Sequence, residues 1–160
     1  MNTKWAKLVS DNFVVPRSCK IDNFSINQLT VRDITEDYEA VMTSIEKLKG
    51  TFDFYPEWPR SDMSVDEDLS NLGWHQTEFE MGTSFAYSVR LVDTNKYVGC
   101  VYLFPSNQEN KLVDAYSWVR KGCEHLDSAL FLIVKEWIEN EWPFKVGSVN
   151  YPISRSYPTK

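Results

Sequence analysis

Apolar and polar residues alternate over residues 24–30, which predicts a first β-strand. The spacing then becomes helical, and Asp33 followed by Glu36 resembles a capping box, in which side chains satisfy the free amides of the first turn. We therefore expect a helix that begins at Asp33 and stops at Gly50, a residue type that favours helix ends. The apolar residues at helical spacing are Tyr38, Val41, Met42, Ile45 and Leu48.

Ser64 and Glu67 form a second capping box and predict a second helix that ends near Gly82. Its expected apolar stripe consists of Val65, Leu69, Leu72 and Phe79. Residues 51–63, between the two predicted helices, contain two prolines and four aromatic residues. This segment is expected to be an irregular loop whose aromatic side chains either tie it to the core or form the wall of a ligand pocket.

The second half of the chain predicts a sheet and one long helix. Strands are expected over residues 84–93, 96–104 and 112–120, and a polar turn joins the first two into a hairpin. The helix that follows carries its apolar residues on one side, namely Leu126, Leu130, Ile133, Val134, Trp137 and Ile138. A β-rich segment over residues 145–151 then completes a β-α-β crossover to a parallel neighbour.

The composition fits one compact domain. The chain has 160 residues, of which 42% are apolar, enough to bury a core. We expect one domain over residues 24–160 and an extension over residues 1–23 packed along its edge. The net charge of −6 and the lack of a basic run argue against a nucleic-acid partner. Neither a signal-peptide core nor a run of about 18 apolar residues occurs, so a cytoplasmic protein without membrane contact is expected.

The three cysteines, Cys19, Cys100 and Cys123, lie far apart and in no metal-ligand spacing. This pattern argues against disulfides and against a bound metal. Cys100 falls in an apolar strand and is expected to be a buried, inert thiol. Cys123 lies on a loop beside Arg120 and Lys121, where neighbouring cations can make a thiol reactive, although an ordinary loop thiol is the commoner case.

The segments YVGCVYLFPS (97–106) and DAYSWVRK (114–121) resemble the third and fourth strands of the GNAT N-acetyltransferase superfamily. Further segments similar to small bacterial GNAT-like proteins are WP…LSNLGWHQTEFEMGTSFAYSV, SWVR, LDSAL and EWPF. The resemblance covers residues 24–151. It implies an α+β fold, α/β in some schemes, with a mixed, mainly antiparallel central sheet and helices on both faces. The fold would be shortened at the carboxyl terminus, because the last helix and strand pair of the superfamily have no counterpart.

The resemblance also implies acetyl-CoA as the cosubstrate. In GNAT proteins the pantetheine arm pairs with the fourth strand, and the pyrophosphate rests on amides at the start of the following helix. Residues 122–127 stand in place of the usual Q/R-x-x-G-x-G/A pattern and keep neither glycine position. Asp127 is expected to be the helix N-cap, where its carboxylate competes with phosphate for the amides. The residues implied at the cofactor site are Trp118, Val119, Arg120, Lys121, His125, Asp127 and Ser128.

Amine acetylation needs a base for the attacking amine and often an acid for the leaving thiolate. Asp114 matches a position at which several GNAT proteins carry the base, although a carboxylate at a strand start is equally often only a polar residue. Tyr151, with Tyr157 as the alternative, lies near the position of the superfamily's acid. Both tyrosines also suit structural roles, because the usual NxxSxxxY segment is not recovered.

The resemblance places the acceptor over the two predicted helices and the loop between them. The residues implied there are Trp58, His75 and Tyr102, with Glu78 and Glu80 at the rim. Aromatic rings and acids suit a cationic amine. His75 also fits the role of a hydrogen-bonded packing residue, because it lies beside the predicted apolar stripe, and Tyr102 also fits simple packing.

Two functions follow from the resemblance. The first is an acetyl-CoA-dependent N-acetyltransferase that acts by direct transfer on a small amine or a peptide amino group. The second is a GNAT-fold protein that has lost the use of acetyl-CoA and binds a ligand or partner. A homodimer is a further expectation, because the superfamily's fifth strand would be an edge that either the 1–23 extension or another chain must cover.

Overall fold

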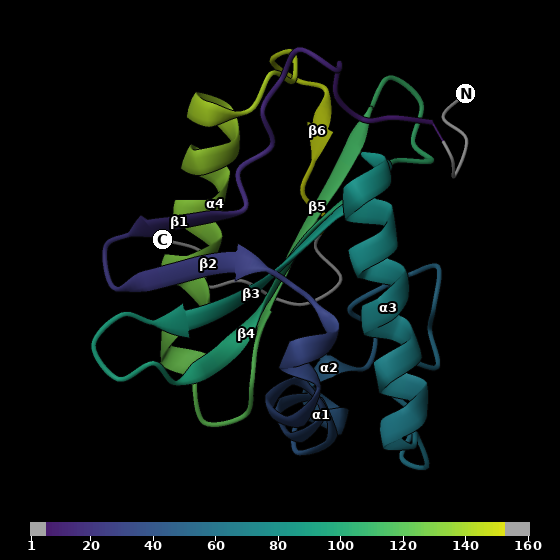
Figure 1. Cartoon of the computed structure of the whole chain (residues 1–160), viewed down its shortest axis with the longest axis vertical. Helices are drawn as coiled ribbons and strands as arrows, with labels where there is room; N and C mark the ends of the chain where they lie inside the picture. Colours follow the sequence, from purple (N-terminus) through teal and green to yellow (C-terminus); the bar gives the residue numbers. More distant parts are fainter. Residues whose placement is uncertain (1–5, 153–160) are drawn as a thin grey trace.

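The computed structural model, which describes residues 6–152, contains a six-stranded sheet in the order β1-β2-β3-β4-β5-β6 (Figure 1). The strands are β1 (Ser18–Ile21), β2 (Phe24–Gln28), β3 (Phe85–Leu91), β4 (Tyr97–Pro105), β5 (Val113–Val119) and β6 (Val149–Asn150). Each strand pairs antiparallel with the next, except that β5 and β6 are parallel. The predicted mixed, mainly antiparallel sheet is confirmed.

Helices cover both faces of this sheet, as predicted. They are α1 (Ile34–Met42), α2 (Ile45–Leu48), α3 (Val65–Met81) and α4 (Asp127–Glu141), with 3-10 turns over Val31–Asp33 and Glu124–Leu126. The first three lie on one face and α4 lies on the other (Figure 1). Within residues 6–152, none of the helices combines the length and apolar character needed to cross a bilayer.

The first helix begins at an earlier cap than predicted. The Thr30 hydroxyl accepts a hydrogen bond from the Arg32 amide, and the Thr30 amide donates to the Asp33 carboxylate over 2.9 Å. Together these bonds form a capping box around the 3-10 turn that leads into α1. The predicted capping box of Asp33 with Glu36 is therefore wrong, because Asp33 is already bonded back to Thr30.

The predicted helix is also interrupted after Met42, where α1 ends. The break falls at Ser44, whose hydroxyl accepts a hydrogen bond from the Lys121 amide over 2.8 Å. This bond ties the turn after β5 to the junction of α1 and α2. Gly50, with φ of +84°, follows α2 and turns the chain out of the helical region near the predicted stop.

The boundaries of α3 are the predicted ones. The Ser64 hydroxyl accepts a hydrogen bond from the Glu67 amide over 3.1 Å, which caps the first turn. Gly82 ends the helix in the left-handed conformation, with φ of +76°. Sequence alone was sufficient here, because both signals are local.

The buried side of α3 differs from the predicted stripe. Leu72 and Phe79 are buried as expected, whereas Val65 and Leu69 are exposed. Asp68 is buried instead, at 3% exposed. The helix is thus rotated so that a carboxyl group faces the sheet, which the apolar pattern did not predict.

β3 and β4 form the predicted hairpin. β5, α4 and β6 form the predicted β-α-β crossover, in which β6 lies parallel to β5. β6 is shorter than the predicted strand over 145–151. Among the described residues, β5 pairs with β6 only through Val113 and Asp114. The two parallel strands therefore meet at the start of β5 and are not paired along the rest of it.

The two faces of the sheet differ in chemistry. The face under α4 buries mainly apolar side chains, including Leu130, Val134 and Ile138 of the helix. The face under α1 and α3 buries side chains with polar tips, namely Tyr97, Cys100, Tyr102, Tyr116 and Trp118. Buried polar groups require hydrogen-bonding partners, so the polar interactions within the core are concentrated in this second layer.

Residues 6–23 pack against the domain and include β1. The Leu8 amide donates to the Gly82 carbonyl over 2.9 Å, and the Phe13 ring lies 5.3 Å from that of Trp142. β1 is the edge strand next to β2, at the opposite edge of the sheet from β6. β1 therefore is not the segment that would cover β6.

All three cysteines are free thiols. Cys100 is fully buried in β4, and Cys123, in the turn before α4, is also buried at 2% exposed. Cys123 is thus a free thiol in a loop, as expected, and its side chain packs into the core under α4. In the part of the chain that the structure describes, no group of three or more metal-ligating residues comes together.

A side chain at Gly99 would collide with the neighbouring strand, because a Cβ there lies 1.9 Å from the Trp118 carbonyl oxygen. We predict that Gly99→Ala lowers the free energy of unfolding by about 1–3 kcal/mol, since β5 must shift to make room. Urea unfolding followed by circular dichroism measures the change. Gly73→Ala, whose nearest contact would be 4.0 Å away, is the control and should not destabilise. Equal stability of both variants would contradict the close approach of β4 and β5.

Candidate functional site

A cavity of about 560 Å³ lies between α3, β4 and the loop over residues 51–63. The loop contributes Phe52, Phe54, Tyr55 and Trp58 to its lining. α3 contributes Asp68, Trp74, His75 and Glu78, and β4 contributes Tyr102 and Phe104. Its size and mainly apolar lining with a few polar groups are typical of small-molecule sites.

Phe52 is the centre of the aromatic wall of this cavity. Its ring centroid lies 5.1 Å from that of Trp58, 5.2 Å from Tyr102 and 5.0 Å from Tyr116. The contacts with Tyr102 and Tyr116 are edge-on, an arrangement that aromatic rings prefer. The loop therefore both packs on the core and forms the cavity wall, the two roles that the sequence left open.

The mouth of the cavity is aromatic and partly acidic. Phe54 is 62% exposed and Trp74 is 58% exposed, although both line the cavity. Of the two predicted rim acids, Glu78 lines the cavity, whereas Glu80 forms an ion pair with Arg17 over 2.7 Å. Exposed rings gathered beside a hollow are typical of a binding surface.

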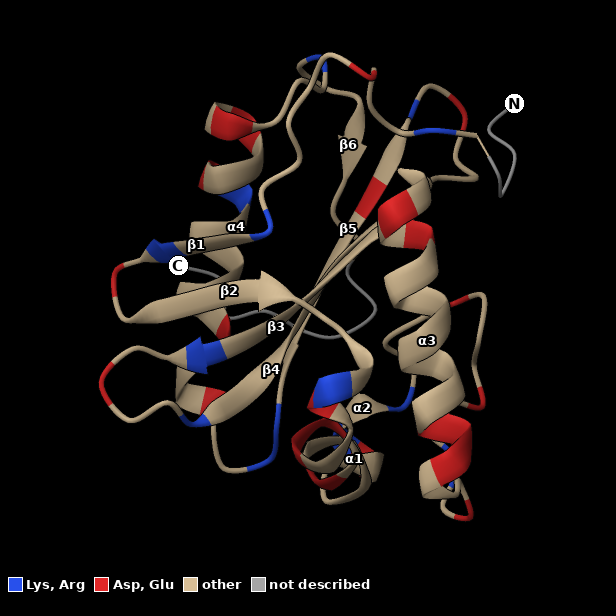
Figure 2. Ribbon diagram, in the orientation of Figure 1, with Lys and Arg blue, Asp and Glu red and all other residues tan. Residues whose placement is uncertain are grey.

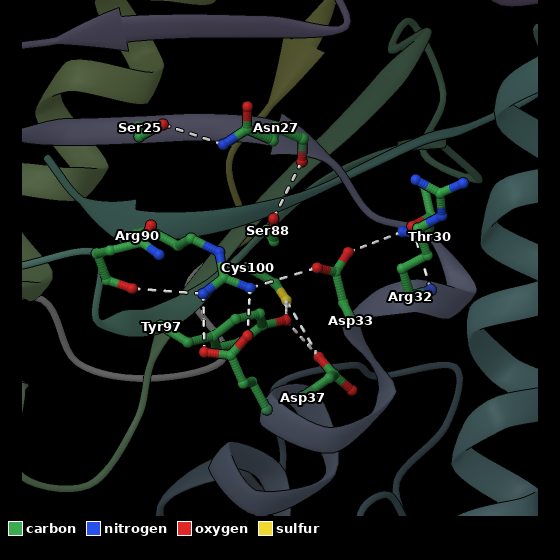
Figure 3. A network of polar contacts seen from close by, with 12 residues as sticks. Ser25, Asn27, Thr30, Arg32, Asp33, Asp37, Ser88, Arg90, Tyr97 and Cys100 are labelled. Atoms are coloured by element: carbon green, nitrogen blue, oxygen red, sulfur yellow. Dashed lines mark hydrogen bonds and ion pairs between the residues drawn. The ribbon is translucent and has the colours of Figure 1, made fainter.

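Two buried carboxyl groups face one another in the lining. Asp37 of α1 and Asp68 of α3 are each 3% exposed. The two groups lie close enough for each to shift the pKa of the other. Figure 3 shows that Asp37 also accepts the Tyr97 hydroxyl, 2.6 Å from its Oδ1, while the Cys100 thiol lies 3.6 Å from the same oxygen.

The surroundings of the pair favour its protonated form. Burial raises the pKa of Asp68 to about 9, and the neighbouring Asp37 adds to this shift. Burial also raises the pKa of Asp37, against the effect of its hydrogen bonds with Asp68 and Tyr97. Two adjacent carboxylates repel each other strongly when both are ionised. Near neutral pH the pair therefore holds one proton.

The pair belongs to a chain of polar groups beneath the aromatic wall. The Tyr97 hydroxyl lies 3.2 Å from the Cys100 Sγ, and a further hydrogen bond joins Cys100 to Tyr102. The Trp118 indole N–H donates to the Tyr102 hydroxyl over 2.9 Å. Burial raises the pKa of Tyr97, Cys100 and Tyr102 well above their usual values, so all three stay protonated. The chain connects α1 and α3 to β5.

Sequence reasoning missed Asp37 and Asp68. A signal was present, because each acid lies four residues before a buried apolar residue of its helix, Val41 and Leu72 respectively. Residues four apart share one face of a helix, so both acids point to the same side as the core. An acid within a buried stripe is unusual unless it has a partner.

Trp58, His75 and Tyr102, the residues predicted on the acceptor side, all line the cavity. The His75 ring lies 5.5 Å from Tyr102 and is stacked on Phe104 at 6.0 Å. Burial lowers the pKa of His75 to about 4, so its imidazole is neutral at neutral pH. The structure thus brings these three residues together at one cavity.

Asp114 and Tyr151, the predicted base and acid, lie where β5 meets β6, outside the lining of the cavity. The Asp114 Oδ1 accepts a hydrogen bond from the Asn150 side chain over 3.0 Å, and Tyr151 follows directly after β6. Burial and the charge of Glu139 raise the pKa of Tyr151 to about 12. Tyr157, the alternative acid, lies outside the described residues.

The turn before α4 binds a carboxylate of the chain itself. Gly122, with φ of +94°, donates its amide hydrogen to Glu124 Oε1 over 2.7 Å. The amide of Glu124 donates to the same carboxylate, and these two bonds lower the pKa of Glu124. The Glu124 side chain is otherwise exposed to solvent. The segment therefore forms an anion-binding turn that Glu124 occupies.

Asp127 is not the N-cap of α4, contrary to the prediction. The 3-10 turn over Glu124–Leu126 precedes the helix, Leu126 is the cap and Asp127 is the first helical residue. The Asp127 amide donates to the Glu124 carbonyl, which pulls this residue into the first turn. The Glu124 carboxylate accepts from amides of the turn before the 3-10 segment, among them that of Gly122, and not from the first amides of α4.

Arg120 and Lys121, which follow β5, make contacts with α1 and with the junction of α1 and α2. The Arg120 guanidinium forms an ion pair with Glu39 of α1 over 2.5 Å and donates to the Tyr97 carbonyl over 3.4 Å. The Lys121 amide donates to Ser44, while its side chain is exposed. The Arg120 side chain, one of the residues implied at the cofactor site, is therefore held by Glu39 and Tyr97.

The other residues predicted at the cofactor site lie between β5 and the first turn of α4. Val119 and Trp118 are fully buried, with the Trp118 indole turned toward Trp58 at a centroid distance of 6.4 Å. His125 is exposed and Ser128 is half-buried. Backbone groups, not the Trp118 side chain, are what β5 offers to a ligand here.

Neither a protein-family model nor any curated protein matches the sequence. Solved structures do share the fold. The ribosomal-protein-S5-alanine acetyltransferase from Vibrio fischeri is 10% identical, with a TM-score of 0.59 over 76% of this chain and 66% of that one. RimL, a ribosomal L7/L12 alpha-N-protein acetyltransferase in complex with coenzyme A, is 13% identical, with a TM-score of 0.56 over 73% and 64%.

A third similar structure is the spermidine N-acetyltransferase from Vibrio cholerae, in complex with CoA and spermine. It is 9% identical, with a TM-score of 0.52 over 72% of this chain and 63% of that one. This chain thus spans slightly less than two thirds of the length of these neighbours. Likeness at such low identity concerns the fold, and the GNAT-like fold inferred from the strand sequences is confirmed.

The shared proton makes stability depend on pH. The folded pKa of Asp68, about 9, lies above the ordinary value of 3.8, so the folded protein holds this proton over a range in which the unfolded chain has lost it. The contribution of Asp68 to stability is therefore fully present below the lower value and is lost as the pH rises toward the higher one. We predict that Asp68→Asn becomes progressively more stable relative to wild type between about pH 5 and about pH 8, by up to about 1.4 kcal/mol per pH unit.

Urea unfolding at several pH values measures this difference in stability. Asp66→Asn, an exposed acid of the same helical turn, is the matched control and should differ from wild type by a nearly constant amount. A constant difference for Asp68→Asn as well would show that the pair does not hold a proton.

Proposed function

We propose that the protein is an acetyl-CoA-dependent N-acetyltransferase that transfers the acetyl group directly to an amine of a small molecule or a peptide. The fold, shared with acetyltransferases of known structure, supports the cosubstrate. The aromatic and acidic cavity supports an amine as the acceptor. The proposed cosubstrate site and the acceptor cavity lie on either side of β5.

The observation that carries the proposal is the fork between β5 and β6. Among the described residues, the two strands pair only through Val113 and Asp114. The Arg120 amide donates to the Val98 carbonyl of β4, so the amide of the preceding residue, Val119, points to the other edge of β5. Backbone groups along such an edge can pair with the amides of a pantetheine arm, as an added strand would.

The turn before α4 supports a place for the phosphates. Its amides already bind the Glu124 carboxylate, so they are oriented for an anion. A pyrophosphate carries more charge than a carboxylate, and the start of a 15-residue helix favours it further. Because the Glu124 side chain is exposed, it can leave the turn without disturbing the core. The exposed side chains of Lys121 and His125 lie beside it.

In the proposed reaction the amine nitrogen attacks the thioester carbonyl, the C–N bond forms and the C–S bond breaks. Asp114 takes the proton that the amine loses, and the Asn150 hydrogen bond fixes its carboxylate. Tyr151 gives a proton to the leaving thiolate. The raised pKa of Tyr151, about 12, keeps its phenol protonated until that step. Asp114 pairs with Asn150 in the register of β5 and β6, and Tyr151 is the next residue along the chain, with its ring against Phe131 of α4.

Calorimetric titration of the protein with CoA and acetyl-CoA tests the proposal. Saturable binding of both is expected, because the fork and the turn are built from backbone groups. The occupation of the turn by Glu124 favours a second function, that of a GNAT-fold protein that binds a ligand or partner without acetyl-CoA. Absence of binding by both wild type and a variant without this carboxylate would favour that second function.

We predict that Glu124→Ala binds CoA several-fold more tightly than wild type, because the phosphates no longer compete with an internal carboxylate. The control is Glu136→Ala, which removes an exposed glutamate of α4 and the same net charge away from the turn. Calorimetry at one ionic strength compares the three proteins. An equal gain in both variants would mean that overall charge, and not occupation of the turn, limits binding.

A further inference from the structure

The reaction assigned above makes no use of the two most deeply buried carboxyl groups that line the cavity, those of Asp37 and Asp68. Asp37 has two donors, from Tyr97 and Cys100. Asp68 differs, because its Oδ2 is buried and has no hydrogen-bond partner among the residues that the structure describes. Leaving a buried acceptor unsatisfied costs free energy, so such an atom in a cavity points to a ligand that would bind it.

We propose that the cavity binds a cationic diamine whose distal ammonium group takes the place of the proton shared by Asp37 and Asp68. This inference rests on the proposed function in one respect: the second nitrogen of the diamine is the one that is acetylated. The ammonium supplies donors to both carboxylates, including Asp68 Oδ2. It also compensates the second negative charge that appears when the shared proton leaves.

The charge distribution around the cavity favours a cation. Among the described lining residues are Asp37, Asp68 and Glu78, but no lysine or arginine. Figure 2 shows the acidic bands on α3, and neither α1 nor α3 contains a basic residue. Arg90, the cation drawn near Asp37 in Figure 3, is engaged by Asp33 and Glu36. An anionic ligand would meet only negative charge in the cavity.

The aromatic wall favours the same class of ligand. Phe52 contacts both Trp58 and Tyr102 in the lining of the cavity, and these rings can place their faces against a cation and its alkyl chain. An uncharged apolar ligand would fill the space but would leave Asp68 Oδ2 without a partner. An alcohol could donate one hydrogen bond, but it could not balance a second carboxylate charge.

The chemistry of the transfer requires a second nitrogen. An ammonium held between two carboxylates remains protonated and has no lone pair with which to attack a thioester. The anchoring group is therefore not the reacting one. Asp114, at the fork, lies outside the lining of the cavity, so the reacting nitrogen is the one that extends away from the acid pair.

Binding changes protonation only at the acid pair. The other titratable groups that face it are Asp33 from the 3-10 turn before α1, His75 and Glu78 from α3, Tyr55 from the loop and, from β4, Tyr97, Cys100 and Tyr102. The tyrosines and the thiol of β4 are held protonated by burial, and a bound cation lowers the pKa of the already neutral His75 further. The shared proton therefore leaves to solvent, and one ammonium replaces it.

Calorimetry with butane-1,4-diamine, in the absence of CoA and in buffers of different ionisation enthalpy, tests this exchange. We expect release of about one proton per diamine bound near neutral pH, and an affinity that rises by about tenfold per pH unit between about pH 6 and about pH 8. 1-Aminobutane should bind with the same proton release but should not be acetylated when acetyl-CoA is added. Butan-1-ol should not bind measurably.

Asp68→Asn should weaken diamine binding by at least about tenfold and abolish the proton release. Asp66→Asn, the exposed acid of the same turn, should retain both. Asp37→Asn provides a second variant if circular dichroism shows that Asp68→Asn is not folded.

Three results would overturn the diamine site: binding no tighter than that of butan-1-ol, binding without proton release, or an unchanged affinity in a folded variant of either acid. Diamine binding with proton release, but without any use of acetyl-CoA, would instead support the site and refute the transferase. The two proposals therefore fail by different results.

Discussion

Burying a carboxyl group in an apolar layer is unfavourable unless hydrogen bonds replace its lost water, and the layer between the sheet and α1 and α3 contains two such groups. Asp37 accepts a hydrogen bond from Tyr97 and lies close enough to Asp68 for each acid to shift the pKa of the other. These interactions join α1, α3 and β4, three elements that are distant in sequence. Both acids also line the cavity. The need of these two carboxyl groups for hydrogen-bonding partners therefore determines which ligands the cavity can bind.

The two candidate sites share one physical property, which is that each is already occupied in the protein without a ligand. The anion-binding turn before α4 holds the Glu124 carboxylate, and the acid pair holds a proton. An occupied site is already shaped for its ligand, so less ordering remains to be done on binding. The ligand must displace the occupant, however, and its affinity therefore depends on salt at the first site and on pH at the second.

Local signals in the sequence predicted the parts of the fold that depend on neighbouring residues. The cap at Ser64, the stop at Gly82 and the hairpin of β3 and β4 all follow from short patterns. Trp58, His75 and Tyr102 were placed at the acceptor site by resemblance, and all three line the cavity. Asp37 and Asp68 were missed because burial of an acid depends on its tertiary partner. Asp127 was misplaced as a cap because a 3-10 turn over Glu124–Leu126 shifts the start of α4.

The most direct test of acetyl transfer to an amine is to measure free thiol released from acetyl-CoA with butane-1,4-diamine present, and to determine the mass of the amine product. The account predicts thiol release that depends on the diamine, with a product that carries one acetyl group. Absence of diamine-dependent thiol release from both wild type and Glu124→Ala, in which the turn is open to phosphate, would contradict it.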